Sequence, residues 1–362
     1  MSHQQRCSRL RKLIRQADTD ACLVTNFVNV SYLTGFTGDD SYLLVTSKDE
    51  TLITDGRYSV QLSEECPDLD LEVRDPGQSM IKAVQRLVKK RKVRSLVVEA
   101  TSMTIDLQDR LECALEKVEL VPVCGMVEKL RMIKDQTEVK AIRQAVKIAE
   151  RAYAVICASL RPEQTEREVA DQLDQQIRLF GGTGCSFPPI VAVGSRSALP
   201  HATPTQRRIG EADFLLIDWG AIAAGYMSDL TRLVVTGKIS PKLRKVYGVV
   251  LKAQRQAIAS IGPGKLMEDV DAVARRVIAK AGYGKYFGHA VGHGVGLEIH
   301  EAPRLGPGQK MPLKTGMVVT VEPGIYLPEW GGIRIEDDVL VTKNGHEVLT
   351  SVGKELNDCV VA

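Results

Sequence analysis

The chain has 362 residues, of which 44% are hydrophobic and 26% are charged, so it is long enough to bury a large core and to form two domains. Its 48 Lys and Arg against 45 Asp and Glu leave a net charge of +3, which is too small to indicate a nucleic-acid or membrane-surface partner. The first 20 residues lack the apolar stretch of a signal peptide and no apolar run is long enough to span a bilayer, which predicts a globular protein of the cytoplasm.

The first third of the sequence alternates between helical and strand patterns. Helices are expected up to Gln16, from Arg57, from Ser79 and near Thr104. Short apolar runs predict the strands, which are ACLVT, SYLLVTS, TLITD, LEVRD, SLVVEA and VELVPV. No glycine-rich phosphate loop follows any of them, so a nucleotide site is unsupported. The pattern predicts an α/β domain over residues 1–130.

A second domain is predicted over residues 131–362. Its first helix, after Asp135, has apolar residues at intervals of three and four, and a second helix is expected over Thr165–Leu179. Two more helices are expected near residues 241–260 and 267–281. The strand candidates are PPIVAVG, DFLLIDWG, GYMSDLTRLVV, MVVTVEP and IRIEDDVLVT. This mixture predicts an α+β domain.

The first candidate residue of a functional site is Asp218, which follows directly after the apolar run Phe214–Ile217. Asp229 lies in the next predicted strand, and a hairpin that places it opposite Asp218 has its turn at residues 223–224. Directly paired carboxylates, with Cβ atoms about 5 Å apart, repel each other unless a cation lies between them. The alternative is two exposed hairpin aspartates, or one aspartate paired with Arg232.

Three later residues add to this pair, namely His293, Glu322 and Glu336. One imidazole and four carboxylates suit hard divalent cations, and four carboxylates are too many for a single zinc ion. Two metal ions about 4 Å apart with shared carboxylates would balance the charge. Taken singly, each residue has a simpler explanation: His293 as a core histidine, Glu322 as a charge at a strand end, and Glu336 as the partner of Arg334.

The sequence around these residues resembles the pita-bread metallopeptidase family, which contains aminopeptidase P, prolidase, creatinase and methionine aminopeptidase. The matching stretches are LPHATP at 199–204, IDWGA at 217–221, SDLTR at 228–232, GHAVGHGVGLEIHE at 288–301, TVEPGIY at 320–326 and GIRIEDD at 332–338. In addition, YLTGFTG at 32–38 and TDGRY at 54–58 resemble the creatinase-type N-terminal domain, which methionine aminopeptidase lacks. The resemblance implies an α/β N-terminal domain plus an α+β pita-bread catalytic domain.

The resemblance also implies a dinuclear metal centre. Asp218 would chelate one ion, His293 and Glu322 would hold the other, and Asp229 and Glu336 would bridge the two. The ions would be Mn²⁺ in the first place, with Co²⁺ or Zn²⁺ as alternatives. A hydroxide held between them would be the nucleophile, because metal coordination lowers the pKa of water toward neutrality. Glu322 would accept and shuttle the proton.

Further residues match positions around the substrate in this family. His201 and His300 would contact the scissile carbonyl and the tetrahedral centre that develops from it. His289 would line the substrate pocket from a loop or strand, because the glycines around it disfavour a helix. Tyr326 would form a hydrogen bond near the substrate.

Two arginines are predicted to support the site. Arg334 alternates with Glu336 in a predicted strand, so it is placed to hold that carboxylate in position. Arg304 stands where prolidase-like members can carry an arginine that binds the carboxylate of the substrate. Aminopeptidase members can carry an arginine there too, so Arg304 does not separate the two activities.

The substrate class follows from the resemblance. An Xaa-Pro bond is a tertiary amide without an N–H, so its enzyme must fit the proline ring and protonate the imide nitrogen that leaves. The implied activity is a metal-dependent Xaa-Pro aminopeptidase acting on peptides with proline second, with Xaa-Pro dipeptidase (prolidase) as the alternative. Relatives imply a homodimer or a higher homo-oligomer.

Two other functional classes use the same scaffold. One is a non-catalytic module that binds peptides or proteins after its metal ligands have been lost. The other is a creatinase-like hydrolase, which cleaves a C–N bond of a small guanidino compound without metals. Both predict missing ligands, whereas all five are present here.

Overall fold

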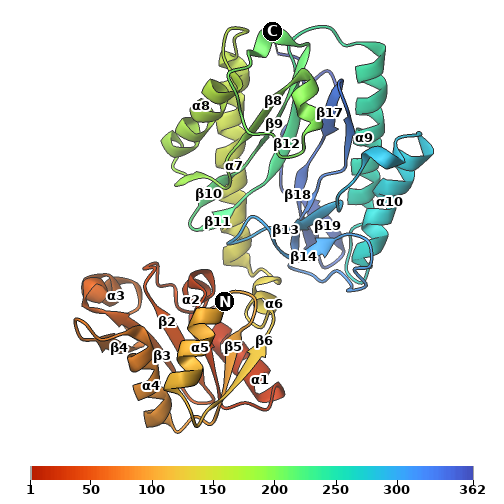
Figure 1. Cartoon of the computed structure of the whole chain (residues 1–362). Coiled ribbons are helices and arrows are strands. Elements are labelled where there is room, and N and C mark those ends of the chain that lie inside the picture. The colour runs from red at the N-terminus through yellow and green to blue at the C-terminus, as the bar shows by residue number, and fades with distance from the viewer. Residues whose placement is uncertain (1, 362) are drawn as a thin grey trace. The chain divides into compact units, whose positions relative to one another are not determined.

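The computed structural model describes residues 2–361, which divide into two compact units between Arg131 and Met132. Each unit has its own helices and strands (Figure 1). Each also buries apolar side chains of its own. Met1 and Ala362, the outer ends of the two predicted domains, lie outside the described residues. Within the described range, no helix combines the length and the apolar character needed to cross a membrane.

The N-terminal unit is built on one mixed six-stranded sheet with the order β4-β3-β2-β1-β5-β6. Side chains alternate along a strand, so Ala21 and Leu23 of β1 join the apolar cluster of α4 and α5 while Cys22 and Val24 point away from it. Its elements are α1 (His3–Gln16), β1 (Ala21–Val24), α2 (Phe27–Thr34), β2 (Tyr42–Thr46), β3 (Glu50–Asp55), η1 (Gly56–Tyr58), α3 (Ser59–Glu65), β4 (Asp70–Arg74), α4 (Met80–Arg91), β5 (Ser95–Glu99), α5 (Ile105–Ala114), β6 (Glu119–Val123) and α6 (Glu128–Arg131).

All six predicted strands of this unit are confirmed, and so are its helices α1, α4 and α5. The helix expected from Arg57 begins as the short 3₁₀ turn η1 and continues as α3. The sequence patterns do not predict α2, although it has clear end signals. Asn26 accepts from the backbone N–H of Val28 and Asn29, and Gly35 follows the helix with φ 83°.

The C-terminal unit places its strands between two helix pairs, α7 with α8 and α9 with α10 (Figure 1). Its elements are α7 (Gln136–Ser159), α8 (Glu166–Leu179), β7 (Gly184–Cys185), β8 (Ile190–Val193), η2 (Gly194–Ala198), η3 (Ile209–Glu211), β9 (Phe214–Trp219), β10 (Ala221–Ala223), β11 (Tyr226–Met227), β12 (Leu230–Val235), α9 (Pro241–Ala259), α10 (Met267–Lys280), η4 (Gly284–Tyr286), β13 (Gly292–Gly294), β14 (Glu301–Leu305), β15 (Val318–Val321), β16 (Gly324–Leu327), β17 (Gly331–Arg334), β18 (Asp337–Thr342) and β19 (Gly345–Val348).

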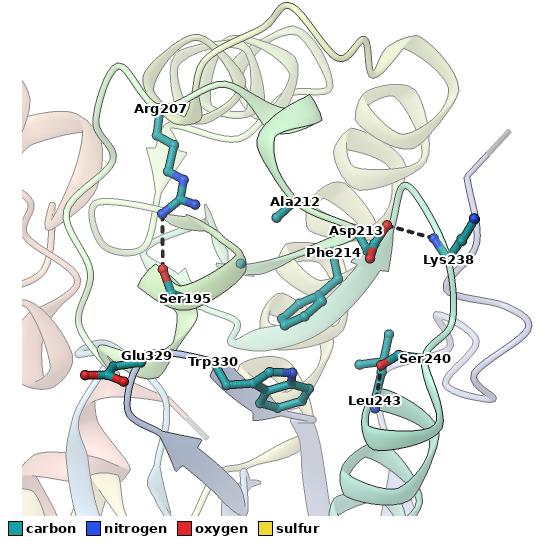
Figure 2. Close-up of a pocket in the computed structure, with 11 residues that line it drawn as sticks. Ser195, Arg207, Ala212, Asp213, Phe214, Lys238, Ser240, Leu243, Glu329 and Trp330 are labelled. Carbon is teal, nitrogen blue, oxygen red and sulfur yellow. Dashed lines mark hydrogen bonds between the residues drawn. The ribbon is translucent and has the colours of Figure 1, made fainter.

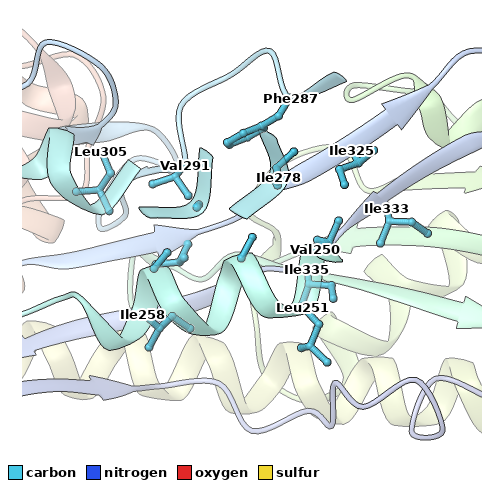
Figure 3. Packing of buried hydrophobic residues seen from close by; sticks show 14 of the residues in the cluster. Val250, Leu251, Ile258, Ile278, Phe287, Val291, Leu305, Ile325, Ile333 and Ile335 are labelled. Carbon is cyan, nitrogen blue, oxygen red and sulfur yellow. The ribbon is translucent and has the colours of Figure 1, made fainter. Parts of the chain in front are cut away.

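The four helices of this unit lie where the apolar periodicity predicts them. Capping boxes start two of them, formed by Asp135 with Glu138 for α7 and by Thr165 with Glu168 for α8. In Figure 3 the core between α9, α10 and the strands includes Val250, Ile278 and Ile333. Because both helix pairs bury their apolar stripes, the strands between them are fixed from two sides.

The pairing of the two aspartate strands differs from the prediction. In the antiparallel pair β9–β12, Asp218 lies opposite Thr231 and not opposite Asp229. The hairpin turns at Ala224 and Gly225, which both have positive φ, 49° and 77°, as a two-residue type I′ turn requires. The predicted turn at residues 223–224 is therefore wrong, and the register is shifted by two residues. Because the shift is even, Asp218 and Asp229 still share one face.

The predicted strand IRIEDDVLVT is two strands in the structure. Its first part, β17, pairs with β16, and its second part, β18, pairs with β15. Glu336 lies in the break between them, where its N–H donates to Thr231 O at 3.2 Å. The patterns also do not predict β7, β10 and β13, which have only two or three residues, nor β14, β16 and β19, whose short sequences contain proline or glycine.

Candidate active site

The five predicted metal ligands come from five separate places in the C-terminal unit: Asp218 lies in β9 and His293 in β13, whereas Asp229, Glu322 and Glu336 lie just outside the ends of strands. Asp229, His293 and Glu336 each offer one ligand atom, and these atoms lie within 4.8 Å of one another. His293 Nε2 is 3.7 Å from Asp229 Oδ2 and 3.4 Å from Glu322 Oε1. Asp218 belongs to the same cluster, because its charge acts on the pKa of Asp229, of Glu322 and of Glu336.

The carboxylates of this cluster repel one another. Asp229 and Glu336 are only 4% and 2% exposed. Burial raises the pKa of Asp229 well above its usual range, and the charges of Glu336 and Asp218 raise it further. Burial, followed by the charges of Glu322 and Asp218, does the same for the pKa of Glu336, and burial raises the pKa of Glu322 to about 8. Such a cluster favours the binding of a cation.

Two of these side chains also have a buried oxygen without a hydrogen-bond donor, Asp218 Oδ1 and Asp229 Oδ1. Buried polar atoms are nearly always paired, so two such atoms facing one cluster point to a missing partner. Carboxylate oxygens with one imidazole are a donor set for divalent cations. The residues present therefore fit a metal site.

Asp338 is a buried member of this region that the sequence analysis missed. Its Oδ2 accepts from the backbone N–H of Asp229 at 3.0 Å, and its Oδ1 is buried without a donor. Burial raises the pKa of Asp338 to about 8. Asp338 thus holds the chain at Asp229, and the run of three acidic residues, EDD at 336–338, was the available signal.

Arg334 contacts a different carboxylate from the one predicted. Its Nη2 donates to Asp218 Oδ2, and no hydrogen bond joins it to Glu336 among the described residues. The reason is that β17 ends at Arg334, so Glu336 does not continue its strand. The two are linked indirectly, because Thr231 Oγ1 accepts from Arg334 Nε at 3.1 Å and donates to Glu336 Oε2 at 2.6 Å.

Thr231 is a second residue that the sequence analysis missed. It lies opposite Asp218 in the sheet and is 0% exposed. A signal was available, because residues two apart in a strand share a face, and Thr231 stands two positions after Asp229. Arg232, which the sequence analysis considered as an alternative partner for one aspartate, instead forms an ion pair of 2.7 Å with Asp337.

His289 and Tyr326 lie beside the cluster and have a defined hydrogen-bond direction. His289 Nδ1 is 2.8 Å from Ala290 O, which can only accept, so Nδ1 carries the proton. Its Nε2 then accepts from Tyr326 OH at 3.0 Å, and the Tyr326 oxygen accepts from Arg334 Nη1 at 2.9 Å. Burial lowers the pKa of His289 to about 4, so the ring is neutral at neutral pH.

The other predicted substrate residues are more exposed. The ring of His300 lies 4.4 Å from that of His293, edge to face, and burial lowers the pKa of His300. His201 is exposed, and its charge acts on the pKa of both His289 and His300. Arg304 of β14 is exposed and is the register partner of His293, so the two side chains share a face.

Comparison with known proteins identifies the family. Residues 140–343 match the model of metallopeptidase family M24, and residues 6–133 match the creatinase/prolidase N-terminal domain. This chain belongs to metallopeptidase family M24. An Xaa-Pro dipeptidase of Pyrococcus horikoshii is 35% identical over 352 residues, which cover 96% of this chain and 98% of that protein.

Solved structures of M24 relatives have the same fold. An Xaa-Pro dipeptidase from Bacillus anthracis superposes with a TM-score of 0.95 at 40% identity, covering 98% of this chain and 99% of that one. An X-Pro aminopeptidase from Thermotoga maritima gives a TM-score of 0.88 at 36% identity, covering 94% and 98%. The α/β domain joined to a pita-bread domain, predicted from the motifs, is thereby confirmed.

This M24 metallopeptidase also has a surface pocket of about 310 Å³ that contains none of the predicted site residues (Figure 2). Its wall includes Ser195 of η2, Phe214 of β9 and Trp330 from the β16–β17 turn. Arg207 Nη1 donates to Ser195 Oγ across it at 3.2 Å. The metal-ligand cluster therefore does not lie in this pocket.

Proposed function

We propose that this M24 metallopeptidase hydrolyses the Xaa-Pro bond at the N-terminus of peptides. The observation that carries the proposal is the cluster of Asp229, His293 and Glu336, whose ligand atoms lie within 4.8 Å of one another. Relatives similar over nearly the whole chain are named Xaa-Pro dipeptidase and X-Pro aminopeptidase, which supports the substrate class.

The five clustered residues would hold two divalent cations, with Mn²⁺ as the first candidate and Co²⁺ or Zn²⁺ as alternatives. Bound ions would polarise the scissile carbonyl and make water a nucleophile at neutral pH. In the proposed roles Asp218 binds one ion, His293 and Glu322 bind the other, and Asp229 and Glu336 touch both. Thr231 and Arg334 keep these carboxylates in place through the hydrogen bonds described above.

The remaining side chains would handle the substrate and its protons. Glu322, partly exposed beside His293, would take a proton from the attacking water and deliver it to the imide nitrogen that leaves. His201 and His300 would donate to the carbonyl oxygen as negative charge develops on it. The neutral His289, held by Tyr326, would line the pocket for the proline ring.

Peptide length separates two candidate activities. An Xaa-Pro aminopeptidase removes the first residue from longer peptides, whereas an Xaa-Pro dipeptidase needs a free carboxylate directly after proline. The dipeptidase is the second candidate: the exposed Arg304, on the face of His293, would supply a cation for that carboxylate, although an aminopeptidase can carry an arginine there as well. The names of the Pyrococcus horikoshii and Bacillus anthracis relatives favour it too.

The deciding experiment compares hydrolysis of an Xaa-Pro dipeptide and an Xaa-Pro-Xaa tripeptide with Mn²⁺ supplied. Faster cleavage of the tripeptide supports the aminopeptidase, and cleavage of the dipeptide alone supports the dipeptidase. An Xaa-Ala-Xaa tripeptide and the Asp229→Ala variant are the controls. If neither proline peptide is cleaved while the protein binds Mn²⁺, the proposed substrate class is wrong.

We also propose that the chain forms a homodimer or a larger homo-oligomer and acts in the cytoplasm. Its resemblance to oligomeric members of the family supports the first point. Light scattering of the purified protein gives the mass of the particle, and cell fractionation gives the location. A monomer at micromolar concentration would contradict the proposed assembly.

A further inference from the structure

One buried carboxylate fastens both ends of the loop that carries His201. Residues 193–205 run from the end of β8 through η2 to Thr205, and His201 itself is exposed. Glu166, the first residue of α8, is 0% exposed. Its Oε1 accepts from Val193 N at 2.8 Å, and its Oε2 accepts from Thr205 N at 2.9 Å and from Thr205 Oγ1 at 2.6 Å.

Arg196 completes this attachment from within the loop. Its Nε lies 3.0 and 2.9 Å from the two oxygens of Glu166, and its Nη2 donates to Thr203 O at 2.6 Å. The contacts therefore hold the backbone before and after His201. Every oxygen of Glu166 has at least two donors, so this buried charge is fully satisfied, unlike the carboxylates of the metal-ligand cluster.

The other side of the loop rests on β17. Ser197 Oγ accepts from Gly332 N at 2.8 Å and donates to Gly194 O at 2.6 Å. A Cβ on Gly332 would lie 2.1 Å from Ser197 O, so the contact requires glycine there. The loop is thus held between α8 and the strand that ends at Arg334.

We propose that Glu166 and Arg196 are positioning residues for His201. The proposal rests on the proposed function, in which His201 donates to the scissile carbonyl. Among residues 2–361, His201 has no hydrogen-bond partner of its own, so the path of its backbone is what sets the place from which the imidazole extends. A displacement of about 1 Å in such a group can cost on the order of 100-fold in rate.

A matched pair on the same helix provides the control. Asp174 Oδ1 accepts from Cys185 N at 2.8 Å, and Asp174 Oδ2 accepts from Arg178 Nε at 2.8 Å. Arg178 also donates to Thr183 O. This acid and arginine fasten the loop at residues 180–185 with the same chemistry, but that loop carries none of the proposed site residues.

The kinetic test is a double-mutant cycle with Mn²⁺ content measured for each protein. We expect Glu166→Gln to lower kcat/KM about 10- to 100-fold at unchanged metal content. In a His201→Ala background the same change should cost less than about 2-fold, because the group it positions is gone. Asp174→Asn should change kcat/KM by less than about 2-fold, both in the wild-type protein and in the His201→Ala background. Equal losses from Glu166→Gln in both backgrounds would overturn the proposal.

A second readout does not depend on activity. The chain has 6 histidines, so their ring signals can be followed by NMR, with His201 assigned by its loss in His201→Ala. Glu166→Gln should shift the His201 signal and Asp174→Asn should not. An unmoved signal contradicts the positioning role whatever the activity, whereas a moved signal in a protein that cleaves no proline peptide contradicts only the proposed function.

If the Glu166→Gln variant does not fold, Arg196→Lys is the variant used in its place for both measurements. It keeps the charge beside Glu166 but cannot also reach Thr203 O in the forked manner of arginine. The expected result is a smaller shift of the His201 signal and a smaller loss of kcat/KM, in the same direction. A wild-type His201 signal in Arg196→Lys, with wild-type kcat/KM, would show that the attachment does not position the ring.

Discussion

Two buried acids, one in each unit, show what distinguishes a structural carboxylate from one that binds a ligand. Glu99 in the N-terminal unit and Asp229 in the C-terminal unit are 5% and 4% exposed. Glu99 accepts from Thr25 N at 2.6 Å, from Asn26 N at 2.8 Å and from Asn29 Nδ2 at 2.7 Å. Asp229 has an oxygen without a donor, and its neighbours are other carboxylates. The two carboxylates are buried to nearly the same extent, so they differ in their hydrogen-bond partners and not in their exposure to water.

The same contrast holds between the units as a whole. Among residues 2–361, the buried carboxylate oxygens without a hydrogen bond belong to Asp218, Asp229 and Asp338, all in the C-terminal unit. The N-terminal unit keeps its buried acid as part of its own backbone network. Unpaired acid oxygens, more than buried acids, therefore mark the place where a cation would bind.

The largest expected effect comes from removing one of the unpaired acids. Asp229→Ala or Glu336→Ala should reduce hydrolysis of an Xaa-Pro-Xaa tripeptide by at least about 1000-fold, because the metal centre loses a shared ligand. The fold should persist, since the change also removes repulsion between carboxylates. Kinetics with circular dichroism measure both effects.

Glu99→Gln is the matched change in the other unit. It should leave the rate per folded molecule unchanged and lower the free energy of unfolding by about 1–3 kcal/mol, because an amide cannot accept from all three donors. Full activity in either metal-ligand variant would contradict the dinuclear centre. Loss of activity in folded Glu99→Gln would contradict the distinction between the two acids.

A buried ion pair next to the cluster gives the next largest effect. The side chains of Arg232 and Asp337 are each 1% exposed, and Arg232 Nη1 also donates to Glu336 O at 2.6 Å. Arg232→Leu should lower the free energy of unfolding by about 3–5 kcal/mol, because Asp337 keeps only Lys354 as a cation and the carbonyl oxygens of Glu336 and Val352 lose their donor. Denaturant unfolding measures this cost.

The exposed pair Arg143–Glu347, with side chains 37% and 45% exposed, is the control for that change. Arg143→Ala should cost less than about 1 kcal/mol, since water screens the charges. Similar costs for the two arginines would mean that burial of the Arg232 pair contributes little to its importance.

The smallest expected effect is on the pH dependence of stability. Burial and repulsion raise the pKa of Asp229, Glu322 and Glu336, to about 8 for Glu322. A carboxyl with a raised folded pKa stabilises the fold below its unfolded pKa of about 4, and this contribution is lost as pH rises toward the folded pKa. Without metal, the free energy of unfolding should therefore fall as the pH rises from 5 to 8.

Bound Mn²⁺ should flatten that slope, because a cation removes the cause of the raised pKa values. Thermal unfolding with a chelator and with Mn²⁺ at several pH values measures the difference. Glu322→Gln should reduce the slope in the metal-free protein. A slope that is the same with and without Mn²⁺ would indicate that the ions do not bind among these carboxylates.

The sequence predicted helices and motifs well but not how strands pair. Apolar periodicity located α7 to α10, and the motifs around Asp218, His293 and Glu336 identified the family. Their roles as ligands stay predictions that metal analysis tests. The hairpin register was wrong because the turn depends on positive φ at Ala224, which its residue type does not suggest.

Contacts between distant segments were also beyond the sequence patterns. Arg334 was predicted to hold Glu336 but pairs with Asp218, since the break between β17 and β18 redirects the chain. The attachment of Glu166 to Val193 and Thr205 joins residues that are far apart in the sequence. Periodicity describes one segment at a time, so it does not report such pairings.

The turn at Ala224 and Gly225 fixes on which face of the hairpin each aspartate lies. The strand pairing has the same register on both sides of Asp229, where Ile222 pairs with Met227 and Trp219 pairs with Leu230. A slip of one strand past the other by one residue would send the Asp229 side chain to the opposite face of the sheet from Asp218, whereas a slip by two would return it. The two-residue turn sets the register that keeps both aspartates on one face.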